Sequence, residues 1–110
     1  MTVINPKTVV VTDNLVATEG DVTFVLKVGT VSGGPYTASS ATVPIAGLTV
    51  SNGAYTINWP AITWAPALSS FTTYFMVAEA QNAEGVSGNS PEASFSLATA
   101  PAPPTALVIS

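Results

Sequence analysis

The chain has 110 residues, enough for one domain, and only 7% of them are charged, which leaves a net charge of −4. It contains no His and no Cys, which excludes histidine-based catalysis, Cys nucleophiles, disulfide frameworks and Cys/His zinc sites. Two scattered lysines cannot form a nucleic-acid-binding surface, and no apolar run approaches the ~20 residues of a membrane span. We therefore expect no catalysis, no cofactor, no nucleic-acid partner and no membrane partner.

β-Branched residues dominate the first half, where short extended runs alternate with turn residues, a pattern typical of an all-β sandwich. Residues 8–12, TVVVT, are the first strong strand, and residues 13–14 and then 19–21 have the composition of a loop. Residues 22–30 are the second strand, before a turn at 32–35. Pro44 confines the segment before it to a sheet edge or a strand end. One face of the second strand carries Val22, Phe24, Leu26 and Val28.

The clearest hairpin joins residues 48–50 to residues 55–59. Its turn is Asn52-Gly53, a pair that tolerates the positive φ angles of a two-residue hairpin loop. Pro60 ends the second strand of this hairpin, and a loop over 61–70 follows. The side chains that share one face are Tyr55, Ile57 and Trp59.

Residues 71–81 form the longest predicted strand. Glu79 places one of its faces toward solvent, so the other face, with Tyr74, Met76 and Ala78, should point into the core. After a turn at 82–85, residues 93–97 are a last core strand. A Pro/Ala linker over 98–104 and one more strand over 105–109 complete the chain.

Residues 74–87, YFMVAEAQNAEGVS, resemble the F strand and F–G turn of bacterial fibronectin type III domains, which run Y-x-x-x-V-x-A-x-N-x-x-G-x-S, with Ala78 in place of the usual Val. Leu68 matches the leucine of that family's tyrosine corner, which implies a hydrogen bond from the Tyr74 hydroxyl to upstream backbone. Residues 27–37 are similar to strand C and its turn, and Ser90-Pro91 to the start of strand G. The resemblance implies an all-β fibronectin type III or immunoglobulin-like β-sandwich of about seven strands.

The N-terminal part departs from this family. Val9 to Val11 stand where the family has a Trp on strand B, and only residues 2–5 could serve as strand A. Residues 100–110, by contrast, resemble the linker and first strand of a following repeat. We therefore divide the chain into a sandwich over 1–98 and, over 99–110, a Pro-rich linker with a C-terminal strand-like arm.

The arm, which contains Pro103, Pro104, Leu107, Val108 and Ile109, has three open fates: pairing with another copy, order on its own domain, or disorder. In the fold implied by the resemblance, strand A starts at the end of the domain opposite to the end of strand G. A seven-residue strand spans ~23 Å, whereas the five residues 98–102 reach at most ~17 Å. Donation to a stacked neighbour is therefore easier than return, and head-to-tail donation builds a ring or a filament.

Three other groups of residues offer weaker alternatives. Asp13, Asn14, Glu19 and Asp21 carry oxygen ligands for Ca²⁺, but their spacing matches no calcium loop, so we expect a solvated acidic loop and no metal. Glu79, Glu84 and Glu92 offer carboxylates without any feature that would raise a pKa, which speaks against a glycosidase. The surface contacts that we expect for a glycan or another surface are Tyr36, Trp64, Asn82, Glu84 and Asn89.

The leading hypothesis is a non-enzymatic structural subunit that assembles through its arm with other copies or with other virion proteins. Low charge favours either an assembly subunit or an extracellular-type domain with a neutral, hydroxyl-rich surface. Residues 1–7 do not resemble a signal peptide. Bacterial domains of this family are usually secreted, so a Met-initiated domain without that signal resembles a bacteriophage virion protein, for capsid decoration or the tail, assembled in the host cytoplasm. The alternative is a carbohydrate- or surface-binding module.

Overall fold

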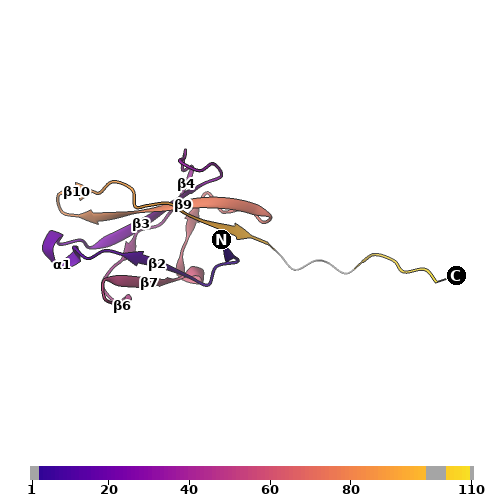
Figure 1. Cartoon of the computed structure of the whole chain (residues 1–110), viewed down its shortest axis with the longest axis horizontal. Helices are drawn as coiled ribbons and strands as arrows, with labels where there is room; N and C mark the ends of the chain where they lie inside the picture. The colour runs from indigo at the N-terminus through magenta and orange to yellow at the C-terminus, as the bar shows by residue number, and fades with distance from the viewer. Residues whose placement is uncertain (1–2, 99–103, 110) are drawn as a thin grey trace.

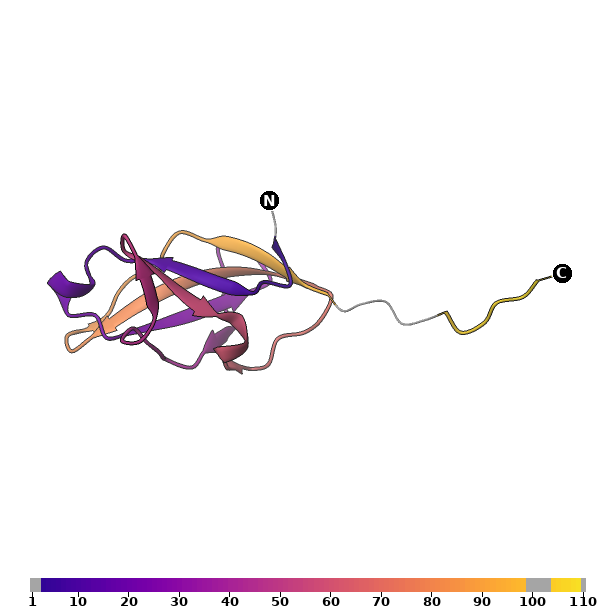
Figure 2. The same cartoon turned by 90° about the horizontal axis from the view of Figure 1, so that it is seen from below.

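The computed structural model describes residues 3–98 and 104–109, and residues 3–98 are built on two β-sheets that face each other (Figures 1 and 2). The larger sheet has the order β1-β11-β9-β3-β4-β8, with β10 paired to β9 and β5 to β3; the smaller has the order β2-β7-β6. The strands of the larger sheet are β1 (Val3–Ile4), β3 (Thr23–Gly29), β4 (Ala38–Ser40), β5 (Val43–Pro44), β8 (Trp64–Ala65), β9 (Thr72–Asn82), β10 (Gly85–Val86) and β11 (Ala93–Leu97). Those of the smaller sheet are β2 (Thr8–Thr12), β6 (Thr49–Ser51) and β7 (Ala54–Asn58).

Two short helices complete the described part of the chain, α1 (Val16–Glu19) between β2 and β3, and η1 (Trp59–Ala61) after β7. Neither is long and apolar enough to cross a membrane. Figure 1 places α1 beside the β9–β10 turn, at the end of the molecule opposite to the C-terminus. The sequence does not predict α1, because four residues are too few to show a helical period.

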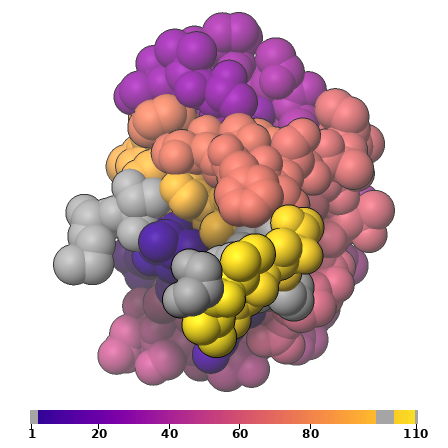
Figure 3. Space-filling view, turned by 90° about the vertical axis from the view of Figure 1, so that its right-hand side faces the viewer, coloured from indigo at the N-terminus to yellow at the C-terminus, as the bar shows by residue number. Residues whose placement is uncertain are grey.

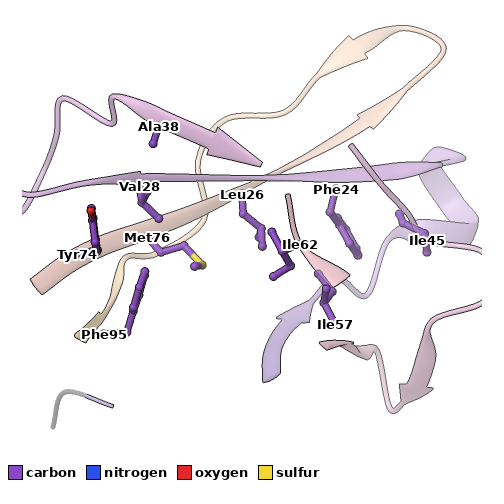
Figure 4. Close-up of a cluster of buried hydrophobic side chains, with 10 residues drawn as sticks. All are labelled: Phe24, Leu26, Val28, Ala38, Ile45, Ile57, Ile62, Tyr74, Met76 and Phe95. Atoms are coloured by element: carbon purple, nitrogen blue, oxygen red, sulfur yellow. The ribbon is translucent and has the colours of Figure 1, made fainter. Parts of the chain in front are cut away.

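The hydrophobic core fills the space between the sheets (Figure 4). Phe24, Leu26 and Val28 of β3 are at most 1% exposed and form its centre, as the alternation of that strand predicts. Full burial of each such side chain contributes about 1.5–3 kcal/mol. The smaller sheet contributes Ile57, and the remaining buried members are Ala38, Ile45, Ile62, Tyr74, Met76 and Phe95.

Two expectations about side-chain direction are wrong. Val22 is 59% exposed, because it precedes β3 and lies outside the alternation of that strand. Val77, expected to face solvent like Glu79, is 3% exposed. Because β9 is a central strand with β11 and β3 on its two sides, neighbouring side chains cover its outer face, where Lys27 Nζ lies 3.4 Å from Glu79 Oε1.

The predicted hairpin and the longest strand are confirmed. Asn52 and Gly53 have φ angles of 49° and 78°, the left-handed values that a two-residue turn between β6 and β7 requires. A Cβ atom at Gly53 would collide with the Asn14 side chain, a second reason for Gly there. β9 is the longest strand, with Tyr74 and Met76 buried in the core.

The Tyr74 hydroxyl links β9 to the loop before it. The backbone N–H of Ser69 donates to Tyr74 Oη at 2.7 Å, so the predicted bond between this hydroxyl and upstream backbone is confirmed. The ring is 7% exposed and stacks on Phe95 at a centroid distance of 5.5 Å. One residue thus ties the core to the loop before β9.

Substitution of Tyr74→Phe should lower the free energy of unfolding by about 1–3 kcal/mol, because the part-buried Ser69 N–H loses its acceptor while the ring remains. Urea unfolding of the variant beside the wild type measures this loss. Tyr55→Phe, at a hydroxyl without a partner among the described residues, is the control and should change stability less. Equal losses in the two variants would contradict the role given to the Tyr74 bond.

Candidate assembly site

The arm is the most exposed apolar part of the described chain. Leu107, Val108 and Ile109 are 88%, 85% and 89% exposed, and Pro104 is exposed as well, whereas Pro103 lies outside the described residues. Figures 1 and 2 show residues 104–109 clear of the two sheets, and Figure 3 looks onto the end of the molecule where they lie. The strand predicted over 105–109 is absent from the single chain, because a strand needs a neighbouring backbone to pair with.

The N-terminal strand takes a position that leaves the smaller sheet open. β1 pairs in parallel with β11, with Val3 opposite Phe95, rather than with β2. Asn5 secures it, since its N–H donates to Ser96 O and its Oδ1 accepts from Ala98 N, both at 2.8 Å. Within residues 3–98 and 104–109, β2 is consequently an edge strand, paired only with β7.

The free edge of β2 presents unpaired backbone groups. Its register with β7 is flanked by two backbone bonds, from Trp59 N to Lys7 O and from Asp13 N to Gly53 O. Since bonded pairs alternate in an antiparallel ladder, odd-numbered residues of β2 face β7. The N–H and C=O groups of Thr8, Val10 and Thr12 therefore point to the open side.

An apolar groove runs beside this edge and reaches the core. A hollow of about 230 Å³ lies between β2 and the segment that leads into β11, and Leu26 and Met76 of the core line it. A second, of about 200 Å³, continues past Trp59 and Phe95. The two hollows share Val9, Val10, Met76 and Ala93, so they form one continuous groove.

The edge carries none of the usual protection against pairing. Natural edge strands are blunted by charges, Pro residues or bulges, or are very short. The other described edges of both sheets are short, with two residues each in β1 and β8 and three in β6. β2 has five residues without charge or Pro, and Val10 at its centre is 55% exposed. This edge is therefore open to pairing with a further strand.

The predicted aromatic contact is only partly exposed. Trp64 is half-buried in β8 and packs on Trp59, with ring centroids 5.7 Å apart. Trp59 also packs edge-on against Phe95, at 5.1 Å. Both Trp rings therefore belong to the margin of the core, because β8 pairs with β4 and holds Trp64 against it. Neither forms a flat, open platform.

The Tyr36 hydroxyl, another predicted contact, is engaged inside the molecule. It donates to Glu92 Oε2 at 2.6 Å, and Ser32 Oγ and Gly33 N donate to the same carboxylate at 2.6 and 2.7 Å. These three bonds, led by that of Ser32, hold the pKa of Glu92 below its usual range, and Glu92 in turn raises the pKa of Tyr36. Glu92 thus fastens the turn after β3 to the start of β11.

The other predicted contacts lie around the β9–β10 turn. Asn82 Nδ2 donates to Glu19 O at 2.9 Å and Asn82 Oδ1 accepts from Glu84 N at 2.8 Å, so this amide is a structural link. Glu84 and Asn89 are exposed. Asp13, Glu19 and Asp21 lie together near the same turn, and Asp21 is 8% exposed rather than solvated as the sequence predicts.

The sequence does not reveal the open edge formed by Thr8, Val10 and Thr12, because the alternation of TVVVT shows a strand but not which of its edges is free. It also does not reveal Phe71, which is 77% exposed with a φ of 58°. Phe71 directly precedes Thr72, the partner of Leu97, and so lies beside the end of β11. No pattern in the sequence indicates either feature.

No family model matches the chain, and no curated protein or solved structure matches it.

Substitution of Tyr36→Phe should raise the pKa of Glu92, because the carboxylate loses one of its three donors. At pH values above the pKa of Glu92, its ionised carboxylate accepts these bonds and stabilises the turn. The bonds are lost as the pH falls through that pKa. An NMR titration of the Glu92 carboxyl carbon measures the shift, with Tyr55→Phe as the control. An unchanged Glu92 titration in Tyr36→Phe would contradict the assignment.

Proposed function

We propose that the protein is a non-enzymatic structural subunit that assembles head to tail by inserting its C-terminal arm beside β2 of the next copy. The observation that carries this proposal is the presence of both halves of such a contact in one chain. The free edge of β2 offers unpaired backbone groups over an apolar groove, and residues 104–109 offer an exposed apolar segment without a partner. Strand addition would satisfy both.

The two halves match in length and in chemistry. Six extended residues span about 20 Å and the five of β2 about 17 Å. Successive side chains of a strand point to opposite faces, so Leu107 and Ile109 would share one face and Val108 would take the other. We place Leu107 and Ile109 in the groove, because they are the larger pair and the groove is lined by apolar residues such as Val9, Leu26 and Met76.

The geometry favours a stacked neighbour over the chain's own edge. β11 ends at Leu97, opposite Thr72 at the start of β9, whereas α1 lies at the far end, bonded through Glu19 to Asn82 at the end of β9. β2 runs toward α1 (Figure 1). An arm that leaves one copy would therefore enter the next copy at its α1 end and run antiparallel to β2. Such contacts build rings or filaments.

The finer fold and the setting belong to the same proposal. The bond from Ser69 N to Tyr74 Oη and the placing of β2 and β7 opposite β3, β9 and β11 support a fibronectin type III-like or immunoglobulin-like sandwich. We place the subunit in a bacteriophage virion, as a capsid decoration or tail protein, where its partners are other copies or other virion proteins. The low charge of the chain suits a surface that neighbours cover.

A carbohydrate-binding module has less support. Sugar stacking needs an open aromatic face, and Trp64 is half-buried against Trp59. The Tyr36 hydroxyl is held by Glu92.

Removal of the arm should abolish self-association. The full chain should form rings or filaments on a sizing column with light scattering, and a chain that ends at Thr99 should be monomeric. Monomers in both samples would show that copies do not pair through the arm.

Two point variants test which face of the arm enters the groove. Leu107→Asp should weaken assembly about 10- to 100-fold, since it replaces a side chain whose burial contributes about 1.5–3 kcal/mol. Val108→Asp makes the same change of charge on the opposite face and is the matched control. Equal loss in the two variants would reject this register, even if the truncated chain is monomeric.

A further inference from the structure

The connection between β2 and β3 brings three carboxylates to one point. Asp13 directly follows β2, Glu19 is the last residue of α1, and Asp21 precedes β3 by two positions. Oxygen atoms of the three lie within 4.8 Å of one another. Gly20, with a φ of 72°, reverses the chain after α1, and the N–H of Asp21 donates to Val16 O at 3.1 Å. This reversal returns Asp21 toward Asp13.

The second observation is that two of these oxygens are buried and have no donor among the residues that the structure describes. Asp21 is 8% exposed, so more than nine-tenths of it is buried, and no described residue forms a hydrogen bond with its Oδ2. Asp13 Oδ2 is also buried and unpartnered, while its Oδ1 accepts from Leu15 N at 2.9 Å. Burial of a carboxylate oxygen without a partner is costly, so a ligand at this point would be strongly favoured.

No lysine supplies the missing positive charge. Lys27 is paired with Glu79, and Lys7 lies before Thr8, at the opposite end of β2 from Asp13. Three carboxylates whose oxygens lie within 4.8 Å of one another thus meet without a cationic side chain beside them, and a bound cation would supply the missing charge.

We infer that Asp13, Glu19 and Asp21 bind a calcium ion at this end of the sandwich. Ca²⁺ takes oxygen ligands at 2.3–2.6 Å, so two oxygens on opposite sides of one ion are about 4.6–5.2 Å apart. The 4.8 Å spread of the carboxylate oxygens fits that sphere. Mg²⁺ is smaller, with bonds of about 2.0–2.1 Å and a strict octahedron. Metals that prefer nitrogen or sulfur ligands are disfavoured, since the chain has no His or Cys.

The surroundings leave room for the waters that complete such a sphere. Calcium sites have 6–8 oxygen ligands, more than three carboxylates supply in monodentate form. Two hollows of about 200 and 170 Å³ adjoin the cluster, and Glu19 lines both. The bond from Asn82 Nδ2 to Glu19 O holds the end of α1 on the β9–β10 turn, so Glu19 is positioned before an ion arrives.

Calorimetric titration of the EDTA-treated full chain with CaCl₂ at pH 7.5 tests the site. We expect saturable binding of one ion with a Kd of about 0.1–1 mM, as in extracellular calcium modules, and weaker binding of MgCl₂. Saturating Ca²⁺ should also raise the Tm. Absence of saturable Ca²⁺ binding up to 10 mM, on the order of tenfold above that range, would overturn the inference.

Variants locate the ion. Asp21→Asn should weaken Ca²⁺ binding at least about tenfold, and in EDTA it should be no less stable than the wild type, because it removes a buried and repelled charge. Glu19→Gln, at an exposed position where misfolding is not a concern, should weaken binding too. Glu84→Gln makes the same change of charge on the neighbouring turn and should leave binding unchanged. Equal Ca²⁺ affinity in Asp21→Asn, Glu19→Gln and the wild type would refute the site.

Discussion

A strand that closes one side of a hydrophobic core must have its backbone groups satisfied on both edges, by another strand or by water. Among the described residues, β2 has a strand partner on one edge, and its other edge is left to water or to an added strand. Its odd-numbered residues bond to β7, while Thr8, Val10 and Thr12 direct their backbone groups past the margin of the sandwich. The groove beside them reaches core residues Leu26 and Met76. The path of β1 explains this opening, because β1 pairs with the edge of the larger sheet at β11 and leaves the β2 edge of the smaller sheet without a neighbouring strand.

Several of the few charged side chains of this chain make contacts within the sandwich. Lys27 and Glu79 cover the outer face of the central strands β3 and β9, and Glu92 fastens a turn through three donors. The remaining concentration of charge is the acidic cluster after β2, where Asp21 is buried. Asp13 belongs to that cluster and also donates its N–H to Gly53 O. An ion at the cluster would therefore order the end of β2 at which we propose that the arm of a neighbouring copy enters.

Local chemistry made much of the fold predictable. The run TVVVT matches β2 at both ends, and 93–97 matches β11, because each is bounded by turn residues. Asn52-Gly53 determined the hairpin through its tolerance of positive φ. The residue pattern around Tyr74 predicted the hydrogen bond between its hydroxyl and the backbone N–H of Ser69. The two residues are five positions apart, so the short loop between them leaves few backbone groups within reach of the hydroxyl.

Features that depend on distant parts of the chain were not predictable. Nothing in residues 3–4 states that they pair with β11 rather than β2, and that choice decides which edge is open. Side chains from other strands cover Val77 and Trp64. The alternation of its strand therefore wrongly predicts that Val77 faces solvent, and the predicted loop position wrongly indicates an open Trp64. From the sequence, Asp21 is predicted to be a solvated loop carboxylate. In the structure, α1 and the turn at Gly20 bring it next to Asp13.

Amide hydrogen exchange at the outward-facing residues of β2 is the sharpest test of strand addition, because it reports on the backbone groups themselves. We expect the N–H groups of Thr8, Val10 and Thr12 to exchange slowly in the assembled full chain and quickly in a chain that ends at Thr99, whereas those of Val9 and Val11 stay protected in both. Equally fast exchange of Thr8, Val10 and Thr12 in the two samples would contradict strand addition at this edge.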